Sequence, residues 1–568
     1  MSNLSIEFVN TKSDLMTVKV NGYYLHSRFD PLQESIRIVE KEYRPNHLHI
    51  LYGYGLGYLA NTLIDKFNNK EKLIIIDPIY NSLNNNNLES AIQIIDSFDE
   101  DLIKKTIENA IDNLNRKIKI ICSPNYNKIL PSEYLDLLGI VKKIQDENLV
   151  MESTIRFLSE SWQENYTKNI LHISQDTSIK VLHKLYNCPV VLASAGPSLI
   201  KQLMYLEKIQ EKVIIIAAGS TISSLISRGI TPDFIMSIDG HINSYSIFKD
   251  LGNLQSNLVY VPSSYYKIQE SFKGQRYFLG SSNDVEYNNN LTKMINLELI
   301  PLPAGASVAH YGLTFASYIS TGPIAIIGQD LAFTNNQSHA DNNLRLRKLD
   351  KEAEDLFEVE GYYNDKVLTN RVFSSMILQF EGMLKALEFE NEIFNCTEGG
   401  AKIKNLNQMA FEDFCTKYVY KRKNEPKIFP KEECDSERII KLIEVLKYEI
   451  KIYSELAKEV NLAVKSLRRN KNMTYFTKSL LRELDKVDKK LKVKLNNLIF
   501  KRILEPIIID VMRSFEPELN ETIEQKHIRV YNQNIYLYDS LYEALKISKV
   551  YIAETIENCE IYLRKNLF

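Results

Sequence analysis

The sequence predicts an α/β protein in three parts, with two parallel sheets followed by a C-terminal helical bundle. Short apolar runs alternate with amphipathic segments as far as about residue 400, which is the pattern of parallel sheets. Several of these runs end in glycine and small polar residues, whereas only helical spacing remains from about residue 430. The expected domains are 1–150, a helical linker at 151–185, a central domain at 186–425 and a helical domain at 426–568.

Composition is typical of a globular protein of ordinary charge. The formal net charge is −2 over 568 residues, with 44% hydrophobic and 25% charged residues. This balance gives no electrostatic case for a nucleic acid or an anionic membrane as partner. The sequence contains no run of about 18 apolar residues, so it predicts no membrane span. The N-terminus lacks the pattern of a secretory signal. The 6 cysteines have no ligand spacing, so we expect no metal site and a cytoplasmic protein.

The N-terminal part has the pattern of a Rossmann-like unit. A strand at His47–Tyr52 leads into the glycine-rich stretch Gly53–Tyr58, and a second strand at Lys72–Ile76 ends at Asp77. In a nucleotide-binding unit the glycines let a phosphate approach, and the acid binds a ribose. The same pattern also describes a tight turn kept for packing, so two interpretations stay open. A further strand is expected at Lys117–Cys122, with helices at Glu89–Ala110 and Ser132–Gln145.

The central domain begins with three strand-like runs, each followed by small or polar residues. These are Val190–Leu192 before Ala193–Ser198, Val213–Ala217 before Gly219–Thr221, and Phe234–Ile238 before Asp239 and Gly240. Further strands are expected at Leu258–Pro262, Arg276–Leu279, Leu297–Leu302, Ile324–Ile327 and Glu392–Asn395. The order predicts a doubly wound sheet with a ligand at its carboxyl edge.

Three other segments of the chain have a clear expectation. Residues 151–185 should form one long helix whose Trp162, the only tryptophan, packs at a domain joint. A helix of small residues should run from Gly305 to about Ser320. The polar stretch 334–365 is expected to be a functional lid or a disordered excursion, since loops of that length are rare in compact domains.

Small and polar residues at the predicted strand ends make up the candidate site. Helix starts there offer free backbone N–H groups that suit a phosphate or a carboxylate, and an acid suits a ribose or sugar hydroxyl. The sequence has no GxxxxGK[ST] motif and no Asp-x-Asp pair at these ends, so it favours neither P-loop chemistry nor a metal-bound diphosphate. The residues expected to bind the ligand are Ser194, Ala195, Gly196, Pro197, Ser198, Gly219, Ser220, Asp239, Gly305, Ser307 and Gln329.

Three residues near this edge are candidates for catalysis: His339, Asp239 and Asp330. A histidine close to a ligand can act as a general base, although a loop histidine can also be merely solvated. Asp330 can instead cap the turn that follows its strand. His310 lies within a predicted helix, and we expect it to pack in the core.

The C-terminal part carries a long helix-packing seam. Asp435 or Ser436 can cap a helix whose apolar residues then recur with alternating spacings of four and three. They are Ile439, Ile443, Leu446, Ile450, Tyr453, Ala457, Val460, Val464 and Leu467. Further helices are expected at Leu480–Ile499 and Leu541–Leu563, and the seam would permit a homo-oligomer.

Six stretches of the central segment, in order over about 150 residues, match one known family. They are Ala195–Leu199, Gly229–Asp233, Ser237–Asp239, Gly305–His310, Gly328–Phe333 and Ser338–Ala340. These stretches resemble the Maf family of motility-associated flagellin glycosyltransferases and, more distantly, bacterial CMP-sialic acid transferases. The resemblance implies a Rossmann-like N-terminal domain, a central doubly wound, sialyltransferase-like α/β domain and a C-terminal helical bundle.

The same resemblance implies a protein O-glycosyltransferase needed for flagellum assembly and motility. The donor would be a CMP-activated nonulosonic acid of pseudaminic or legionaminic type, and the acceptors would be Ser or Thr hydroxyls of flagellin. Inversion at the anomeric carbon would be expected, with no metal or other cofactor. The implied roles are nucleotide binding by Gly196, Pro197 and Ser198, ribose or sugar binding by Asp239 and Ser220, phosphate or carboxylate binding by Gly305 and Ser307, and general base for His339. The sialyltransferases differ in carrying a hydroxyl residue at Ala304 and an asparagine at Asp239.

Two other functions stay open as alternatives. One is a pterin pyrophosphokinase that uses ATP, because an archaeal group with that activity shares the central domain. The other is a flagellin-binding assembly factor that has kept the fold without the activity.

Overall fold

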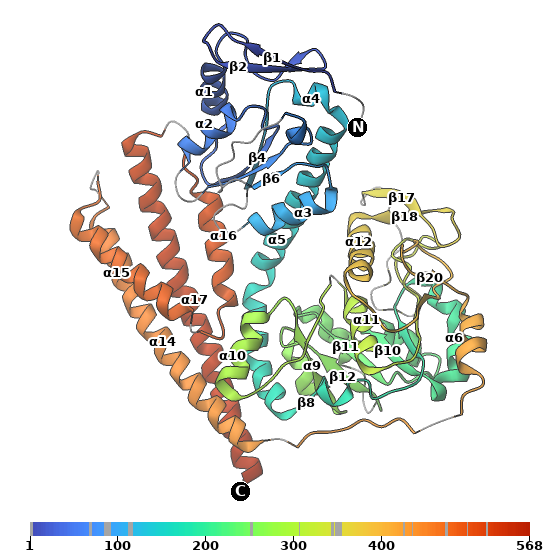
Figure 1. Ribbon diagram of the computed structural model, residues 1–568. Coiled ribbons are helices and arrows are strands. Elements are labelled where there is room, and N and C mark those ends of the chain that lie inside the picture. Colours follow the sequence, from blue (N-terminus) through green and yellow to red (C-terminus); the bar gives the residue numbers. More distant parts are fainter. Residues whose placement is uncertain are drawn as a thin grey trace. The chain divides into compact units, whose positions relative to one another are not determined.

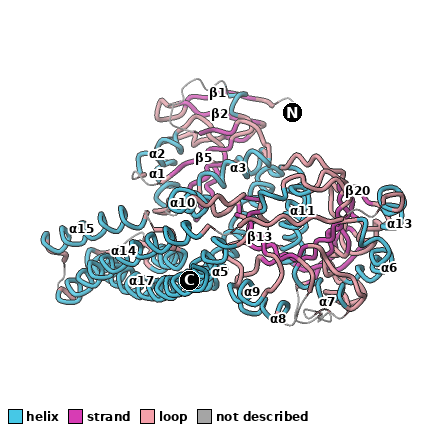
Figure 2. Tube along the Cα trace, turned by 90° about the horizontal axis from the view of Figure 1, so that it is seen from below, coloured by secondary structure: helices cyan, strands magenta, loops and turns pink. Residues whose placement is uncertain are grey.

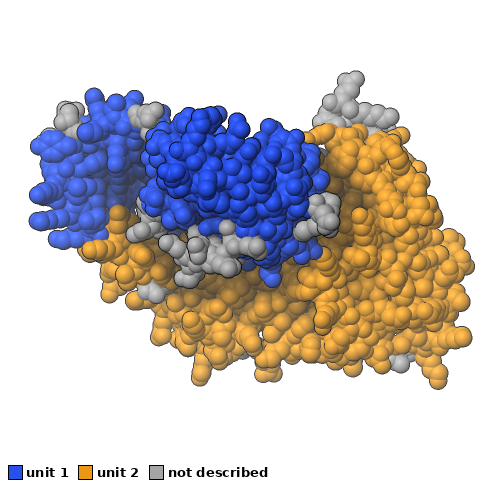
Figure 3. Space-filling model, turned by 45° about the horizontal axis from the view of Figure 1, so that its top comes forward, with its two compact units in different colours: residues 1–159, 460–487, 504–542 blue, residues 160–459, 488–503, 543–568 orange. Residues whose placement is uncertain are grey.

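The computed structural model describes the chain as two compact units (Figure 1 and Figure 3). Unit 1 comprises residues 1–159, 460–487 and 504–542, and unit 2 comprises residues 160–459, 488–503 and 543–568. Each unit is therefore built from segments that lie far apart in the sequence. The described residues are 4–67, 71–83, 93–111, 117–249, 251, 254–305, 307–341, 343, 346, 355–423, 426–433, 435–471, 475–496, 498–518 and 521–567.

Unit 1 contains a four-stranded parallel sheet in the order β6-β5-β4-β7. The strands are β4 (His47–Tyr52), β5 (Lys72–Ile76), β6 (Gln93–Ile95) and β7 (Lys117–Cys122). Three of them, β4, β5 and β7, have the predicted bounds, because each is rich in isoleucine and leucine and is followed by glycine or a polar residue. The first strand lies between the second and the last, as in one half of a Rossmann-like sheet.

The helix expected at Glu89–Ala110 is wrong over its middle part. Residues 93–95 form β6, and the helix α3 (Glu100–Ala110) begins only after Asp99. The carboxylate of Asp99 accepts a hydrogen bond from the backbone N–H of Leu102 at 3.0 Å, which caps the helix start. Residues 89–92 of the expected helix lie outside the described residues.

Sequence analysis missed the first elements of unit 1. An antiparallel sheet of β1 (Ile6–Asn10), β2 (Met16–Val20) and β3 (Tyr23–Tyr24) precedes α1 (Pro31–Glu42) and α2 (Tyr58–Lys66). The strand β1 is exposed or half-buried along its whole length, so it lacks the apolar run by which other strands were recognised. The short helix α4 (Tyr126–Ile129) follows β7.

A single helix, α5 (Pro131–Gln175), replaces the two helices that were expected at Ser132–Gln145 and 151–185. It ends at Gln175 because Thr177 and Ser178 form the strand β8 and pair with the central sheet. The carboxylate of Asp176 reinforces this end, since it forms an ion pair with Arg276 at 2.7 Å.

Unit 2 is built on a nine-stranded parallel sheet in the order β20-β19-β16-β9-β10-β11-β12-β13-β8. In chain order its strands are β8 (Thr177–Ser178), β9 (Val190–Ala193), β10 (Ile214–Ala218), β11 (Phe234–Ser237), β12 (Asn257–Tyr260), β13 (Arg276–Phe278), β16 (Ile324–Ile327), β19 (Ile393–Asn395) and β20 (Asn407–Gln408). The predicted doubly wound α/β architecture is thus confirmed. The strand expected at Leu297–Leu302 is wrong, because only Pro301–Leu302 (β15) is extended, and it pairs with β14 (Gly280–Ser281) in a separate sheet.

Helices lie on both sides of the central sheet, with α11 on one face and α7 on the other (Figure 2). They are α6 (Ile200–Ile209), α7 (Ile222–Ile226), α8 (Tyr245–Phe248), α9 (Tyr266–Ser271), α10 (Val285–Ile295), α11 (Val308–Ile319), α12 (Arg371–Ala386) and α13 (Phe411–Phe414). The apolar face of α11 is fully buried against the strands, with Phe315 packed edge-on to Phe234 at 5.2 Å between ring centroids. This burial fixes the start of α11 near the carboxyl edge of the sheet.

The polar stretch 334–365 contains regular structure that the sequence did not reveal. Residues 356–360 form β17 (Leu356–Glu360), which pairs antiparallel with β18 (Lys366–Asn370). The pairing is anchored on the central domain, because the backbone N–H of Phe333 donates to the carbonyl of Leu368 at 2.8 Å. Residues 342, 344–345 and 347–354 lie outside the described residues.

The C-terminal region is helical, as predicted. It contains α14 (Ser436–Arg469), α15 (Lys478–Leu495), α16 (Glu505–Ser514) and α17 (Ile523–Leu567). The predicted seam of α14 is buried, with Ile439, Leu446, Tyr453, Val460 and Leu467 all fully excluded from solvent. Within the described residues, none of the helices is long and apolar enough to cross a membrane.

A buried carboxylic acid ties α14 to the chain that follows α15. Oε1 of Glu449 accepts hydrogen bonds from the backbone N–H groups of Ile499 at 3.1 Å and Phe500 at 2.9 Å, and from the hydroxyl of Tyr453 at 3.2 Å. Burial raises the pKa of Glu449 to about 7. The folded state therefore holds a proton that the unfolded chain releases at a lower pH.

We expect Glu449→Gln to stabilise the protein at high pH. The folded-state pKa is raised, so the wild type loses stability as the pH rises from the ordinary value of 4.5 through 7. The loss approaches about 3 kcal/mol at pH 8, since one pKa unit corresponds to about 1.4 kcal/mol. Glutamine keeps an acceptor oxygen and does not titrate. The free energy of urea unfolding between pH 5 and 8 measures the difference, with the exposed Glu444→Gln as control. If the unfolding free energies of the wild type and Glu449→Gln differ by the same amount at pH 5 and at pH 8, this role of Glu449 is contradicted.

Candidate functional site

The central sheet has a topological switch point between β9 and β16. From β9 the order continues to β10 and β11 on one side, whereas β16 and β19 continue on the other. Connections on the two sides leave in opposite directions, so the loops diverge above these strands and leave room for a ligand. The predicted ligand-binding residues Ser194–Ser198 and Gln329 follow these two strands.

The turn after β9 is held tightly against the turn after β16. The backbone N–H of Gly196 donates to the carbonyl of Gly328 at 2.7 Å. A Cβ at Gly196 would lie 2.1 Å from Oδ1 of Asp330, so glycine is required there because the carboxylate occupies the space. Pro197 stands in the first turn of the following helical segment, as predicted.

The carboxylate of Asp330 accepts hydrogen bonds from both turns. Oδ1 accepts from the backbone N–H of Ser198 at 3.1 Å, and Oδ2 accepts from the hydroxyls of Ser198 at 2.7 Å and Thr334 at 2.6 Å. Burial raises the pKa of Asp330, and the hydrogen bonds from Thr334 and Ser198 oppose that rise. Asp330 and Ser198 are each about 1% exposed, so in this geometry they hold the turns together.

A third turn completes the base of the site, and sequence analysis did not assign it. A Cβ at Gly399 would lie 2.1 Å from the Ser198 hydroxyl, and Gly400 has φ +69°. The backbone N–H of Ala401 donates to the carbonyl of Asp330 at 2.7 Å. The signal was a Gly-Gly pair directly after a predicted strand, which is the same pattern that identified the other turns.

The segment after β16 folds over the ends of β9 and β10. The backbone N–H of Ala340 donates to the carbonyl of Ala195 at 2.8 Å, and the amide of Asn343 donates to the carbonyl of Ser220 at 2.9 Å. This docking brings the half-exposed His339 to the edge of the sheet, with Nδ1 at 2.9 Å from the hydroxyl of Ser338. Asn343 was not predicted, because nothing in its local pattern indicates a partner 123 residues away.

Three buried polar atoms at this edge make no hydrogen bond within the part of the chain that the structure describes. They are Oγ of Ser194, Oγ of Ser237 and Oε1 of Gln329, at the ends of β9, β11 and β16. An unpaired buried polar group costs about 1–3 kcal/mol, so native structures rarely leave several together without water or a ligand. Ser237 was not among the predicted ligand-binding residues.

Asp239 lies at the end of β11, one strand beyond β10. Its Oδ1 accepts a hydrogen bond from the backbone N–H of His241 at 2.9 Å, and its side chain is half-buried. The neighbouring Gly240 is covered by Trp162, because a Cβ there would lie 2.9 Å from the indole. The single tryptophan therefore packs beside this strand end and can report on it by fluorescence.

The helix start predicted at Gly305 and Ser307 is the start of α11, and it lies at the same edge of the sheet, close to the turn after β10. A Cβ at Gly219 would be 3.7 Å from Val308, the first residue of α11. The hydroxyl of Ser307 lies 2.7 Å from Nδ1 of His310, whose ring is buried and stacks on Phe380. The prediction that His310 packs in the core is thus confirmed, and burial lowers its pKa to about 4.

Gly305 lies against the ring of His310, where a Cβ would come within 2.5 Å. Packing against His310 is therefore enough to require glycine at position 305, whether or not a ligand binds there. Ala306, between Gly305 and Ser307, lies outside the described residues. Within the described part of the chain, no group of three or more His, Cys, Asp and Glu side chains is placed to hold a metal ion.

The glycine-rich loop of unit 1 is closed by its own side chains. Asp77 accepts hydrogen bonds from the backbone N–H of Tyr54 at 2.8 Å and from the hydroxyl of Tyr126 at 2.8 Å. Nε2 of His26 accepts from the backbone N–H of Leu56 at 2.8 Å. These bonds use the N–H groups that a phosphate would need.

The space beside the three glycines of that loop is also filled. A Cβ at Gly53 would lie 2.4 Å from the ring of Tyr126, and one at Gly55 would lie 2.5 Å from Nε2 of His26. Of the two interpretations left open by the sequence, this geometry favours the packed turn over the nucleotide site.

Comparison with known proteins is informative mainly about the fold. A family model described as 6-hydroxymethylpterin diphosphokinase MptE-like matches residues 164–336, which is less than a third of the chain. The solved structure of a Maf glycosyltransferase from Magnetospirillum magneticum AMB-1 is similar over 98% of this chain and 92% of that one, with a TM-score of 0.51 and 13% identity. No curated protein matches the chain by sequence. The likeness confirms a Maf-like fold, as the motifs implied.

We expect Asp330→Ala to destabilise the central domain by about 2 kcal/mol or more, because it leaves the buried N–H of Ser198 without an acceptor. Asp330→Asn should cost less, since its oxygen can still accept that bond and the hydroxyls of Ser198 and Thr334 can turn to accept from its amide. Urea unfolding followed by the fluorescence of Trp162 measures both losses. Equal stability of the wild type and Asp330→Ala would show that the turns do not depend on this carboxylate.

The closed loop of unit 1 predicts a pH-dependent stability. Burial lowers the pKa of His26 to about 4, so its contribution is complete above pH 6.5 and is lost as the pH falls toward 4. Relative to His26→Gln, the unfolding free energy of the wild type should fall by about 3 kcal/mol between pH 6.5 and pH 4. Calorimetric unfolding at pH 7 and pH 4.5 measures the difference, and the exposed His183→Gln should follow the wild type. A constant difference between wild type and His26→Gln would argue against the buried neutral ring.

Proposed function

We propose that the protein is a glycosyltransferase that moves a nonulosonic acid, of pseudaminic or legionaminic type, from its CMP-activated donor to Ser or Thr hydroxyls of flagellin. The main support is the carboxyl edge of the central sheet, where three turns meet at a switch point and three buried polar atoms have no partner among the described residues. A likeness to a Maf glycosyltransferase over 98% of the chain supports the same activity class.

The chemistry of this donor suits such an edge. The acceptor hydroxyl oxygen attacks the anomeric carbon, the bond from that carbon to the CMP phosphate oxygen breaks, and CMP leaves with the electron pair. Phosphate is already a good leaving group, so the protein has mainly to bind negative charge and accept one proton. In this proposal the start of α11 supplies N–H groups to the anions, because the N–H groups of Gly196 and Ser198 are already used by Gly328 and Asp330. Asp239 with Ser220 binds ribose or sugar hydroxyls.

His339 is the residue we propose as general base. Its loop is docked on Ala195, which places the imidazole at the carboxyl edge of the sheet, and a neutral imidazole can accept a proton near pH 7. Asp330 is a poorer choice for a base, because its carboxylate is buried and its oxygens already accept hydrogen bonds.

A second candidate function is transfer of a diphosphate from ATP to a hydroxymethylpterin, which the family model over residues 164–336 favours. In that reaction the pterin hydroxyl attacks the β-phosphorus and AMP leaves. It uses the same edge of the central sheet but neither flagellin nor a CMP-sugar. The released nucleotide therefore distinguishes the two candidates.

The test combines purified protein, purified flagellin and CMP-pseudaminic or CMP-legionaminic acid, with intact-mass measurement of flagellin. We expect a mass gain, with a rate about 10²–10⁴-fold lower in His339→Gln. His183→Gln, an exposed histidine of the same unit, should keep the wild-type rate. No gain with either donor would refute the glycosyltransferase, and AMP released from ATP and 6-hydroxymethylpterin would favour the second candidate. A full rate in His339→Gln would refute only the base.

A further inference from the structure

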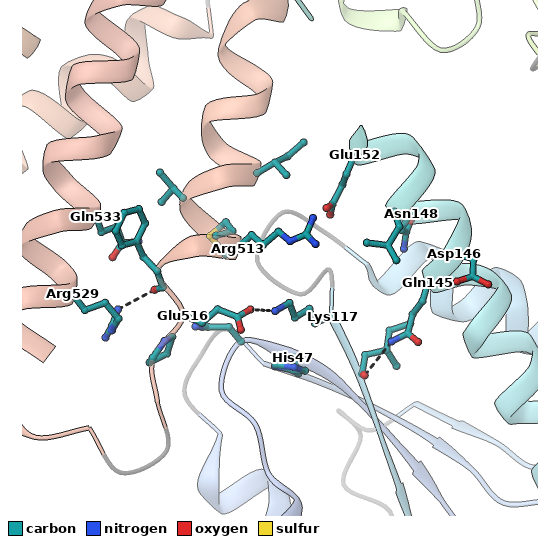
Figure 4. A pocket seen from close by; sticks show the side chains of 18 residues that line it. His47, Lys117, Gln145, Asp146, Asn148, Glu152, Arg513, Glu516, Arg529 and Gln533 are labelled. Atoms are coloured by element: carbon teal, nitrogen blue, oxygen red, sulfur yellow. Dashed lines mark hydrogen bonds and ion pairs between the residues drawn. The ribbon is translucent and has the colours of Figure 1, made fainter. Parts of the chain in front are cut away.

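Unit 1 contains a cavity of about 740 Å³ at the edge of its sheet that lies away from the glycine loop (Figure 4). His47 and Lys117 line it, and these are the first residues of β4 and β7. The glycine loop follows the opposite end of β4, so the two features lie at different edges of the same sheet. Residues of α5, α16 and α17 form the walls. Cavities of roughly 300–1,000 Å³ are of the size that binds small molecules.

The cations around this cavity differ in whether they are paired. Lys117 forms an ion pair with Glu516. Arg529 forms an ion pair with Glu521 at 2.6 Å. Arg513 forms no ion pair or hydrogen bond with any described residue, and Figure 4 shows it reaching from α16 toward α5. One guanidinium is therefore left with its full donor capacity at the cavity.

A second donor lies on the opposite wall. Nδ2 of Asn148, on α5, is buried and makes no hydrogen bond within the described residues. Acidic lining residues are Asp146, which is exposed, Glu152, and Glu516, which is already paired with Lys117. Among the described lining residues, the exposed carboxylate of Asp146 and the amide of Gln533 also make no hydrogen bond or ion pair. Arg513 is the unpaired cation of this lining, and Nδ2 of Asn148 is its buried unpaired donor.

Apolar side chains also line the cavity. Ile118, Leu149, Val511, Met512 and Phe515 line the cavity together with the polar residues. Arg513 is exposed at the mouth of the cavity, so it can reach an anion that enters from solvent, and a charge-assisted hydrogen bond would hold the acidic group there. A ligand that satisfies both features has an acidic group at one end and an apolar or aromatic body at the other.

We propose that this cavity is a binding site for a small organic anion, a carboxylate or a phosphate ester, whose acidic group is bound by Arg513 and Asn148. Its body would contact Leu149 and Phe515. The inference does not depend on the proposed glycosyl transfer, because every residue that it uses belongs to unit 1.

The test uses the full chain and 8-anilinonaphthalene-1-sulfonate, an aromatic anion whose fluorescence rises in apolar surroundings. We expect saturable binding of one dye per chain. R513Q should weaken its affinity about tenfold or more, as expected for loss of a charge-assisted hydrogen bond. R482Q, which changes an exposed arginine of unit 1 that does not line the cavity, should leave the affinity unchanged.

N148W provides an independent variant, since an indole at this helix position would occupy the cavity. The N148W variant should bind no dye, and its thermal unfolding midpoint should be close to that of the control variant R482Q. Displacement of the dye by adenosine monophosphate would identify a phosphate ligand, and displacement by 4-phenylbutyrate a carboxylate ligand. The proposal is overturned if R513Q binds as R482Q does, if N148W still binds, or if neither compound displaces the dye.

Discussion

The buried carboxylate of Asp330 is the contact on which the central site depends. It joins the turn after β9 to the turn after β16 through Ser198 and Thr334, and its backbone carbonyl accepts the N–H of Ala401 from the turn after β19. Three loops that are far apart in the sequence thereby form one base. Glycine at positions 196 and 400 follows from this contact, because a Cβ at either would come within 2.2 Å of Asp330.

Asp77 plays the same part in unit 1, and the comparison explains how far sequence reasoning could reach. Both acids follow an apolar strand and bind the backbone of a neighbouring glycine turn. A sequence pattern of strand, glycines and acid therefore predicts the turn correctly. It cannot tell whether the turn is open to a ligand, since that depends on His26 and Tyr126, which reach the loop from 30 and 71 residues away.

The same limit applies to the rest of the fold. A strand such as β16 was predicted with its bounds because it is a short apolar run that the fold buries completely. The hairpin of β17 and β18 was missed because its strands are mostly exposed or half-buried and are held by pairing and by Phe333. At the site, His339 could be proposed from its position after a strand, whereas Asn343 became visible only through its bond to Ser220.

What distinguishes the two glycine-rich edges is the balance of their polar groups. In the glycine-rich loop of unit 1, Asp77 and His26 accept hydrogen bonds from the backbone N–H groups of Tyr54 and Leu56. These bonds stabilise the fold, and the same N–H groups are then not available to a phosphate. At the central edge, Ser194, Ser237 and Gln329 each keep a buried polar atom without a partner in the described chain, at a cost of about 1–3 kcal/mol each. Folded proteins tolerate such a cost chiefly where function requires it. If the proposed donor supplied the missing partners, its binding would recover that energy and would stabilise the central domain.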